Sequence, residues 1–203
     1  MSVFVQLLDK CKNLNHQENE NKISPLHVLS YYGYRDALEI LASNLTNLDV
    51  QDKNGRTPLD LACFKGSIGC VECLLLNGAN CDLVDNITQR TALHAAAYNN
   101  FEDCIKIIFM LINDKKDLLN AKDKYQRTPL MIAVEQGHLN TISYLVTQQA
   151  DINATDEKKC TALHRAVSIL NLIKRLIIRT RDRNTCCYKA TLLIQNENIS
   201  SII

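Results

Sequence analysis

The chain has 203 residues, a formal net charge of +1 and 46% hydrophobic residues, and it contains no Trp. The near-neutral charge argues against a general nucleic-acid-binding role, and no apolar run reaches the roughly 18 residues that a membrane span needs. The N-terminus lacks the basic start and apolar stretch of a signal peptide. We therefore expect a cytoplasmic protein that could also enter the nucleus, with no membrane contact, no cofactor and reduced cysteines.

One short pattern recurs along the chain. A Ser or Thr is followed by Pro or Ala, then Leu, and in three cases by His. The Ser or Thr can cap a helix, and Pro suits the first helical turn because its missing N–H is not needed there. Successive motifs are 33, 34, 37 and 33 residues apart, and their leading residues are Ser24, Thr57, Thr91, Thr128 and Thr161. This period and motif are typical of ankyrin repeats. They predict an all-α ankyrin-repeat solenoid of helix pairs linked by β-hairpin or turn fingers.

The first elements follow from this register. We expect residues 1–20 to form a degenerate N-terminal half repeat and a connector, and residues 21–53 to form ankyrin repeat 1. Residues 54–86, ankyrin repeat 2, are the most regular. In both repeats a glycine, Gly33 or Gly66, is expected to take positive φ and end the first helix. Asn54-Gly55 is typical of a two-residue hairpin turn and should form the tip of a finger.

The later repeats depart from this regularity. Residues 87–124 form ankyrin repeat 3, with an insertion in 111–119, and residues 125–157 form ankyrin repeat 4. In residues 158–180, a partial ankyrin repeat 5, Leu170 stands where the earlier repeats have Gly or Asn. A shift of two residues restores an apolar stripe, so we expect a second, displaced helix there. Its buried residues would be Leu172, Ile173, Leu176 and Ile177.

Residues 181–203 show no repeat. Residues 171–203 contain six Lys or Arg and two Asp or Glu, so the charge becomes positive in this part of the chain. We interpret 181–203 as an irregular basic tail outside the solenoid. A basic segment can contact nucleic acid, but Asp182 interrupts this one and its spacing is loose.

Two residue patterns invite a chemical interpretation. The Ser or Thr and the His three positions later put a hydroxyl beside a base in three repeats. Cys70 and Cys73 form a C-x-x-C. Each has a structural explanation: the first pair closes a helix cap, and the two cysteines lie one turn apart beside apolar core positions, where free Cys behaves as a small hydrophobe. We expect no catalytic residue and no metal site, and hence no enzyme.

The order of these motifs also resembles a particular ankyrin family. The segment is similar to part of the ankyrin-repeat regulatory subunits of protein phosphatase 6, in collinear order over residues 21–167. The residues that carry the resemblance include Ser24-Pro25-Leu26-His27, Leu48-Asp49-Val50, Gly55-Arg56-Thr57-Pro58-Leu59-Asp60, Thr128-Pro129-Leu130-Met131 and Thr161-Ala162-Leu163-His164-Arg165. The resemblance implies a non-catalytic scaffold that helps the phosphatase recognise substrates. Family members are longer arrays than this chain.

Two alternatives stay open: a generic ankyrin adaptor with an unrelated protein target, and the non-catalytic fragment of a larger ankyrin-containing enzyme. In each case partners should bind the concave face, which finger tips and the exposed sides of first helices line in this fold. Aromatic residues beside Arg are typical of interface hot spots. The predicted contact residues are Arg56, Arg90, Arg127, Tyr31, Tyr32, Phe64, Lys65, Tyr98, Asn99, Glu135 and Gln136.

Overall fold

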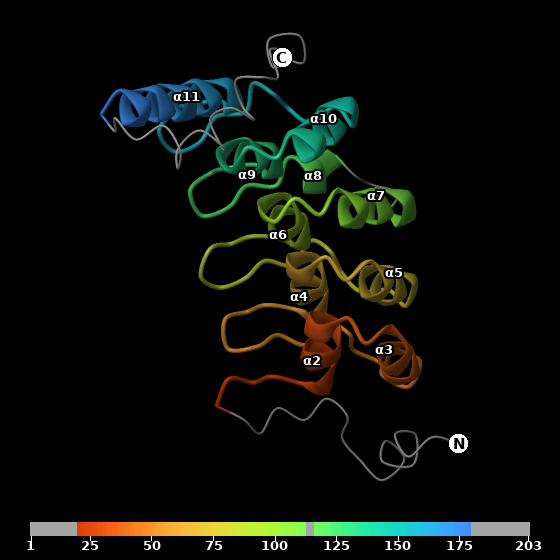
Figure 1. Ribbon diagram of the computed structural model, residues 1–203. Helices are drawn as coiled ribbons and strands as arrows, with labels where there is room; N and C mark the ends of the chain where they lie inside the picture. The colour runs from red at the N-terminus through yellow and green to blue at the C-terminus, as the bar shows by residue number, and fades with distance from the viewer. Residues whose placement is uncertain (1–19, 113–115, 180–203) are drawn as a thin grey trace.

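The computed structural model describes residues 20–112 and 116–179, with side chains to residue 170. Within these ranges the protein is a stack of antiparallel helix pairs without β-strands (Figure 1). The first helices of the four regular repeats form one layer: α2 (Pro25–Tyr32), α4 (Pro58–Lys65), α6 (Ala92–Tyr98) and α9 (Pro129–Gln136). The second helices form the other layer: α3 (Arg35–Ala42), α5 (Ile68–Leu76), α7 (Glu102–Leu111) and α10 (Leu139–Thr147). The predicted all-α ankyrin solenoid is confirmed.

The helix starts follow from the motif. Ser24, Thr57, Thr91 and Thr128 have extended backbone just before the first helices. In the first repeat the Ser24 Oγ lies 2.8 Å from Nδ1 of His27, and the Ser24 backbone N–H donates to the same nitrogen over 3.1 Å. Thr91 and His94 repeat this arrangement at 2.9 and 3.2 Å. The predicted cap between hydroxyl and imidazole is therefore confirmed.

A left-handed residue separates the two helices of each regular pair. It stands nine positions after the capping residue, as Gly33, Gly66, Asn100 and Gly137, with φ between 63° and 77°. The first helix ends there because the positive φ turns the chain out of the right-handed helix. The predictions for Gly33 and Gly66 are confirmed.

The fifth repeat differs from its prediction. Residues Ala162–Arg179 form one continuous helix, α11, instead of a displaced pair. The reason is local: Leu170, at the position of the left-handed residue, has a Cβ that disfavours positive φ, so the helix continues through it. The predicted stripe from Leu172 to Ile177 lies outside the described side chains, and residues 1–19 and 181–203 lie outside the described chain.

The insertion of the third repeat adds a helix that was not predicted. After α7, residues Lys116–Leu119 form the short helix α8. Lys116 and Asp117 are exposed, as expected of a polar insertion, but Leu118 and Leu119 are buried. Two leucines therefore attach the extra turn to the apolar core.

Burial is concentrated between the two helix layers. Leu74 and Val71 are fully buried in α5, and Cys70 and Cys73 are buried beside them. Buried Cys63 and Cys104 belong to the same continuous cluster, which extends from α2 to α11. The interpretation of Cys70 and Cys73 as core residues is confirmed, and burial raises the pKa of Cys70 to about 11.

Candidate concave binding surface

The fingers are built around an aspartate. The second to fifth fingers comprise residues 52–56, 85–90, 123–127 and 156–160, and they precede α4, α6, α9 and α11. In the second finger Oδ1 of Asp52 accepts hydrogen bonds from the backbone N–H of Asn54 (2.8 Å) and Arg56 (2.9 Å). The Asp52 N–H in turn donates to the Arg56 carbonyl, and the Gly55 N–H donates to the Asp52 carbonyl. Asp123 and Asp156 organise the fourth and fifth fingers in the same way.

This geometry corrects the predicted two-residue turn. Of Asn54 and Gly55, only Gly55 has positive φ, 78°, whereas a two-residue type I′ turn needs it at both. Lys53 and Asn54 are instead the central residues of a turn that Gly55 closes. Gln89, Gln126 and Lys159 take the left-handed conformation at the equivalent place in later fingers.

Neighbouring fingers are joined by single backbone hydrogen bonds. The Asn86 N–H donates to the Asn54 carbonyl over 2.7 Å, and the Lys124 N–H donates to the Thr88 carbonyl over 2.8 Å. Buried histidines add a second link: Nε2 of His27 donates to the Arg56 carbonyl over 2.9 Å, since its Nδ1 already accepts from Ser24. The fingers consequently form a continuous edge beside the first helices (Figure 1).

The predicted arginine row lies along this edge, but its members are engaged within the protein. The Arg56 guanidinium donates to Oδ2 of Asp52 through Nε (2.8 Å) and Nη2 (2.6 Å). Arg127 makes the equivalent pair with Asp123 at 2.9 and 2.7 Å, and it also donates to Glu135 over 2.9 Å. Arg127 is largely buried, so it supports the fingers more than it presents charge to a partner.

Arg90 is held differently. Its own finger aspartate, Asp85, uses its oxygens on the hydroxyl of Thr88 and on backbone N–H groups. The Arg90 Nε instead lies 3.6 Å from Oδ2 of Asp123 in the next finger. Its guanidinium carbon lies 5.4 Å from the centre of the Tyr98 ring, a cation–π arrangement.

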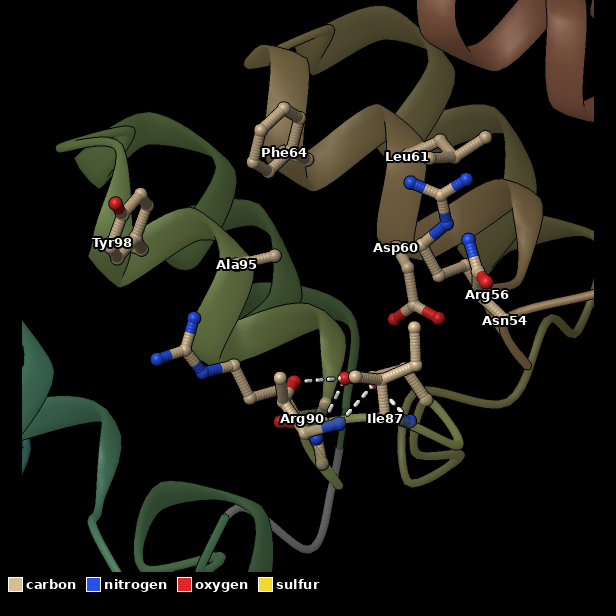
Figure 2. A pocket seen from close by; sticks show the side chains of 12 residues that line it. Asn54, Arg56, Asp60, Leu61, Phe64, Ile87, Arg90, Ala95 and Tyr98 are labelled. Carbon is tan, nitrogen blue, oxygen red and sulfur yellow. Dashed lines mark hydrogen bonds between the residues drawn. The ribbon is translucent and has the colours of Figure 1, made fainter. Parts of the chain in front are cut away.

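Two hollows lie side by side on the concave surface, and they share Arg56 and Leu61. The larger, between the second and third fingers, has a volume of about 410 Å³ (Figure 2). Its lining comprises Asn54, Arg56, Asp60, Leu61, Phe64, Asp85, Ile87, Thr88, Arg90, Thr91, Ala95 and Tyr98. The smaller, about 280 Å³, is lined by Ile23, His27, Val28, Tyr31, Tyr32, Asp52, Arg56 and Leu61.

Six of the predicted contact residues line these hollows: Tyr31, Tyr32, Arg56, Phe64, Arg90 and Tyr98. The other five lie elsewhere. Lys65 Nζ lies 4.4 Å from the centre of the Tyr31 ring, and the Asn99 amide donates to the Ala95 carbonyl over 3.2 Å. Arg127 and Glu135 bond to each other, and Gln136 is an exposed residue at the end of α9.

Sequence reasoning did not place Asp60, Leu61, Val28 or Ile87 on this surface. Asp60 carries the one signal that could have identified it, because it replaces the His of the motif. It is only 7% exposed. Burial raises the pKa of the Asp60 carboxyl to about 7, against hydrogen bonds from Thr57 and with smaller contributions from Asp85 and Asp52.

The hydroxyl–imidazole pairs of Ser24/His27 and Thr91/His94 are buried caps whose remaining nitrogen bonds to a backbone carbonyl, so neither offers a nucleophile and base to a substrate. Within residues 20–112 and 116–179 no group of Cys, His, Asp or Glu has the arrangement of a metal site. None of the helices in that part of the chain is both long and apolar enough to cross a membrane.

Comparison with known proteins agrees with this architecture. A family model described as ankyrin repeats (3 copies) matches residues 2–85 and 67–156, which is more than half of the chain. The protein belongs to the ankyrin-repeat family.

The names of its curated relatives convey several different functions. XBAT31 of Arabidopsis thaliana, assigned by name to the E3 ubiquitin-protein ligases, is 30% identical over 66% of this chain and 31% of its own length. A transient receptor potential cation channel subfamily A member 1 homologue of Caenorhabditis elegans is 28% identical, covering 78% of this chain and 13% of its own. The B-cell lymphoma 3 protein homologue of Mus musculus is 29% identical, over 78% and 36%. The chain thus spans about a third or less of these relatives.

Proposed function

We propose that this protein is a non-catalytic scaffold that binds another protein through its concave surface. The observation that carries the proposal is the pair of adjoining hollows beside the first three fingers. Together they extend from Ile23 on one side to Tyr98 on the other. A surface of this shape suits an extended segment of a partner, whose side chains would enter the two hollows.

The exposed aromatic residues support the same surface. Tyr32, Phe64 and Tyr98 are 65%, 43% and 39% exposed, although each belongs to a first helix whose opposite side is buried. Large aromatic side chains contribute strongly to binding because they bury much area at a small cost in conformational entropy. Arg56 and Arg90 line the same hollow as Phe64 and Tyr98. Charged groups therefore lie among the aromatic rings, and this mixture is typical of a protein interface.

As the partner, we propose protein phosphatase 6, with this chain in the role of a regulatory subunit that helps it recognise substrates. The support is the collinear resemblance over residues 21–167. A generic adaptor for an unrelated protein is the main alternative. A non-catalytic part of a larger ankyrin-containing enzyme is a further one, since relatives named as enzymes are much longer than the matched region. A cytoplasmic location, with access to the nucleus, belongs to the same proposal.

Quantitative affinity capture from cell extract tests the proposal. Three baits are compared: the unchanged protein, Phe64→Ser with Tyr98→Ser on the concave surface, and Leu76→Ser with Met110→Ser as a matched control. Leu76 and Met110 are exposed residues of the other helix layer. We expect a protein that the unchanged bait and the control retain and the concave variant loses. Phosphatase 6 subunits in that set would favour the family hypothesis, and equal retention by all three baits would refute the concave site.

A further inference from the structure

Asp60 is an exception among the residues that close the helix caps. His27 and His94 occupy its position in the first and third repeats, and each uses Nε2 to bond the backbone of the following finger. The Asp60 Oδ2 accepts the Thr57 N–H over 2.8 Å, which preserves the cap. Its second oxygen, Oδ1, accepts no hydrogen bond from any residue that the structure describes. The carboxylate extends from α4 toward Ile87 across the larger hollow (Figure 2).

The charges around this hollow do not cancel. Arg56 is paired with Asp52. A chain of ion pairs joins three further arginines to three acids, so their charges balance. The arginines are Arg90, Arg127 and Arg165, and the acids are Asp123, Glu135 and Asp156. Asp60 and Asp85 line the hollow without an arginine in ion-pair contact within the described residues. The hollow is therefore complementary to a positive charge.

The walls of the hollow suit the rest of a basic side chain. Leu61 and Ala95 provide an apolar lining, and the rings of Phe64 and Tyr98 lie at its border (Figure 2). Apolar and aromatic surface of this kind packs against the methylene groups of Lys, while an aromatic face also attracts the ammonium. A guanidinium prefers two carboxylate oxygens in a fork. Because Thr57 already occupies Oδ2, the single free oxygen favours the compact ammonium of lysine.

We propose that the hollow between the second and third fingers binds a lysine side chain of a partner protein, with the ammonium donating to Oδ1 of Asp60 and the methylene groups packing between Phe64 and Tyr98. This inference rests on the proposed function, and it specifies what the partner presents to that surface. Without the partner, Oδ1 of Asp60 is open to the hollow and accepts no hydrogen bond from the described residues. The lysine supplies the missing donor.

The binding should depend on pH. Burial raises the pKa of Asp60 to about 7, and the ammonium requires the ionised carboxylate, so affinity should fall as the pH falls from 8 to 6. Burial also lowers the pKa of the histidines at the same motif position in α2 and α6: that of His27 falls below its ordinary value, and that of His94 falls to about 4. The charged groups of the two neighbouring fingers that face Asp60 are Asp52, Arg56, Asp85 and Arg90.

The probes are three oriented libraries of fluorescent decapeptides, with Lys, norleucine or Glu fixed at the centre and the other positions identical in composition. Norleucine keeps the methylene groups of lysine and lacks the charge. Binding to the purified full chain is measured by fluorescence anisotropy at pH 8 and pH 6. We expect the lysine library to bind about tenfold more tightly than the norleucine library at pH 8, as for a desolvated charge pair, with a smaller ratio at pH 6.

Asp60→Asn should remove this preference, because the amide has no charge but still offers an oxygen to the Thr57 N–H. Asp36→Asn, the same change of charge on the exposed surface of α3, should retain it. Melting curves of both variants establish that they are folded. The inference is overturned if lysine and norleucine bind equally, if glutamate binds best, if no library binds, or if Asp60→Asn keeps the preference. If the Phe64/Tyr98 variant still loses captured proteins while the peptide experiment fails, the lysine inference is wrong and the proposed scaffold function is retained.

Discussion

The four regular repeats and the helix α11 begin with the same local signal and end in different structures. Thr161 and His164 form the same cap as Thr91 and His94, with the hydroxyl oxygen 2.8 Å from Nδ1. Yet the leucine of the motif is almost fully buried in the regular repeats, as in Leu93 at 0%, and is 46% exposed in α11 as Leu163. Capping needs only neighbouring residues, whereas burial of this leucine needs a following repeat that packs on the helix.

The second difference concerns the end of the helix. Gly66 turns the chain between α4 and α5, and Leu170 at the equivalent place lies within α11. One residue that tolerates positive φ therefore decides whether a repeat contains two helices or one. Because each repeat packs only on its neighbours, such a change stays local and leaves the preceding pairs intact.

Replacing the motif leucine should have the largest effect and should separate the two regions. Leu93→Ala removes a fully buried side chain between α4 and α9, and we expect it to lower the free energy of unfolding by about 2–5 kcal/mol. Leu163→Ala, at the same motif position but half-exposed, should cost less than about 1 kcal/mol. Urea denaturation of the two variants measures both values, and equal losses would show that Leu163 is covered in solution.

The stability of the regular repeats should also depend on pH, through the residue that closes the helix cap. The pKa of Asp60 is about 7, against 3.8 for the unfolded chain, so the folded protein binds a proton that the unfolded chain does not between these values. Its contribution to stability consequently falls as the pH rises from about 4 to 7. Asp60→Asn should gain roughly 4 kcal/mol over the unchanged protein at pH 8 and little at pH 4.

Denaturant titrations of both proteins at several pH values would measure this difference. A difference that does not change with pH would mean that Asp60 is hydrated and not desolvated by the third finger.

His94, at the same position in the next repeat, should act in the opposite direction. Burial lowers its pKa to about 4, against hydrogen bonding to the Arg127 carbonyl and the charge of Asp123. The unfolded chain binds the proton below about 6.5, so stability is lost as the pH falls from there toward 4, by roughly 3 kcal/mol. Comparing Asp60→Asn with Asp60→Asn/His94→Gln isolates this loss, because the opposing carboxyl is absent from both. The double variant should show the flatter acid dependence.

Of the four sets of substitutions, those of the left-handed glycines should have the smallest effect on stability. Alanine at Gly66 or Gly78 must adopt positive φ, at a cost of about 1–2 kcal/mol. At Gly66 a Cβ would also lie 2.4 Å from the Phe101 ring, while at Gly78 it meets nothing within 4 Å. We therefore expect Gly66→Ala to be the more destabilising by about 1 kcal/mol or more. Thermal denaturation can compare them, and an equal loss would mean that Phe101 moves aside freely.

The amino-acid sequence by itself determined what depends on neighbouring residues. The caps at Ser24, Thr57, Thr91 and Thr128 and the left-handed residues nine positions later were predictable, because a hydroxyl beside a free N–H and a residue without a Cβ penalty act within a few positions of the chain. The period of these signals gave the stack of helix pairs. Even the failure of the fifth pair was visible in Leu170, although its result, a single helix, was not predicted.

Tertiary structure alone decided which of the candidate residues are available to a partner. Arg56, Arg90 and Arg127 have equivalent places in the motif, but their surroundings differ. Asp123 of the same finger and Glu135 of α9 engage Arg127, whereas Arg90 lies beside the Tyr98 ring and 3.6 Å from Asp123 of the next finger. The packing of one repeat on another also created the hollow that Asp60 lines and desolvated its carboxyl. Contacts between repeats, such as that of Arg90 with Asp123, join residues about 33 positions apart. Their burial and charge pairing depend on how the repeats stack, which no local pattern specifies.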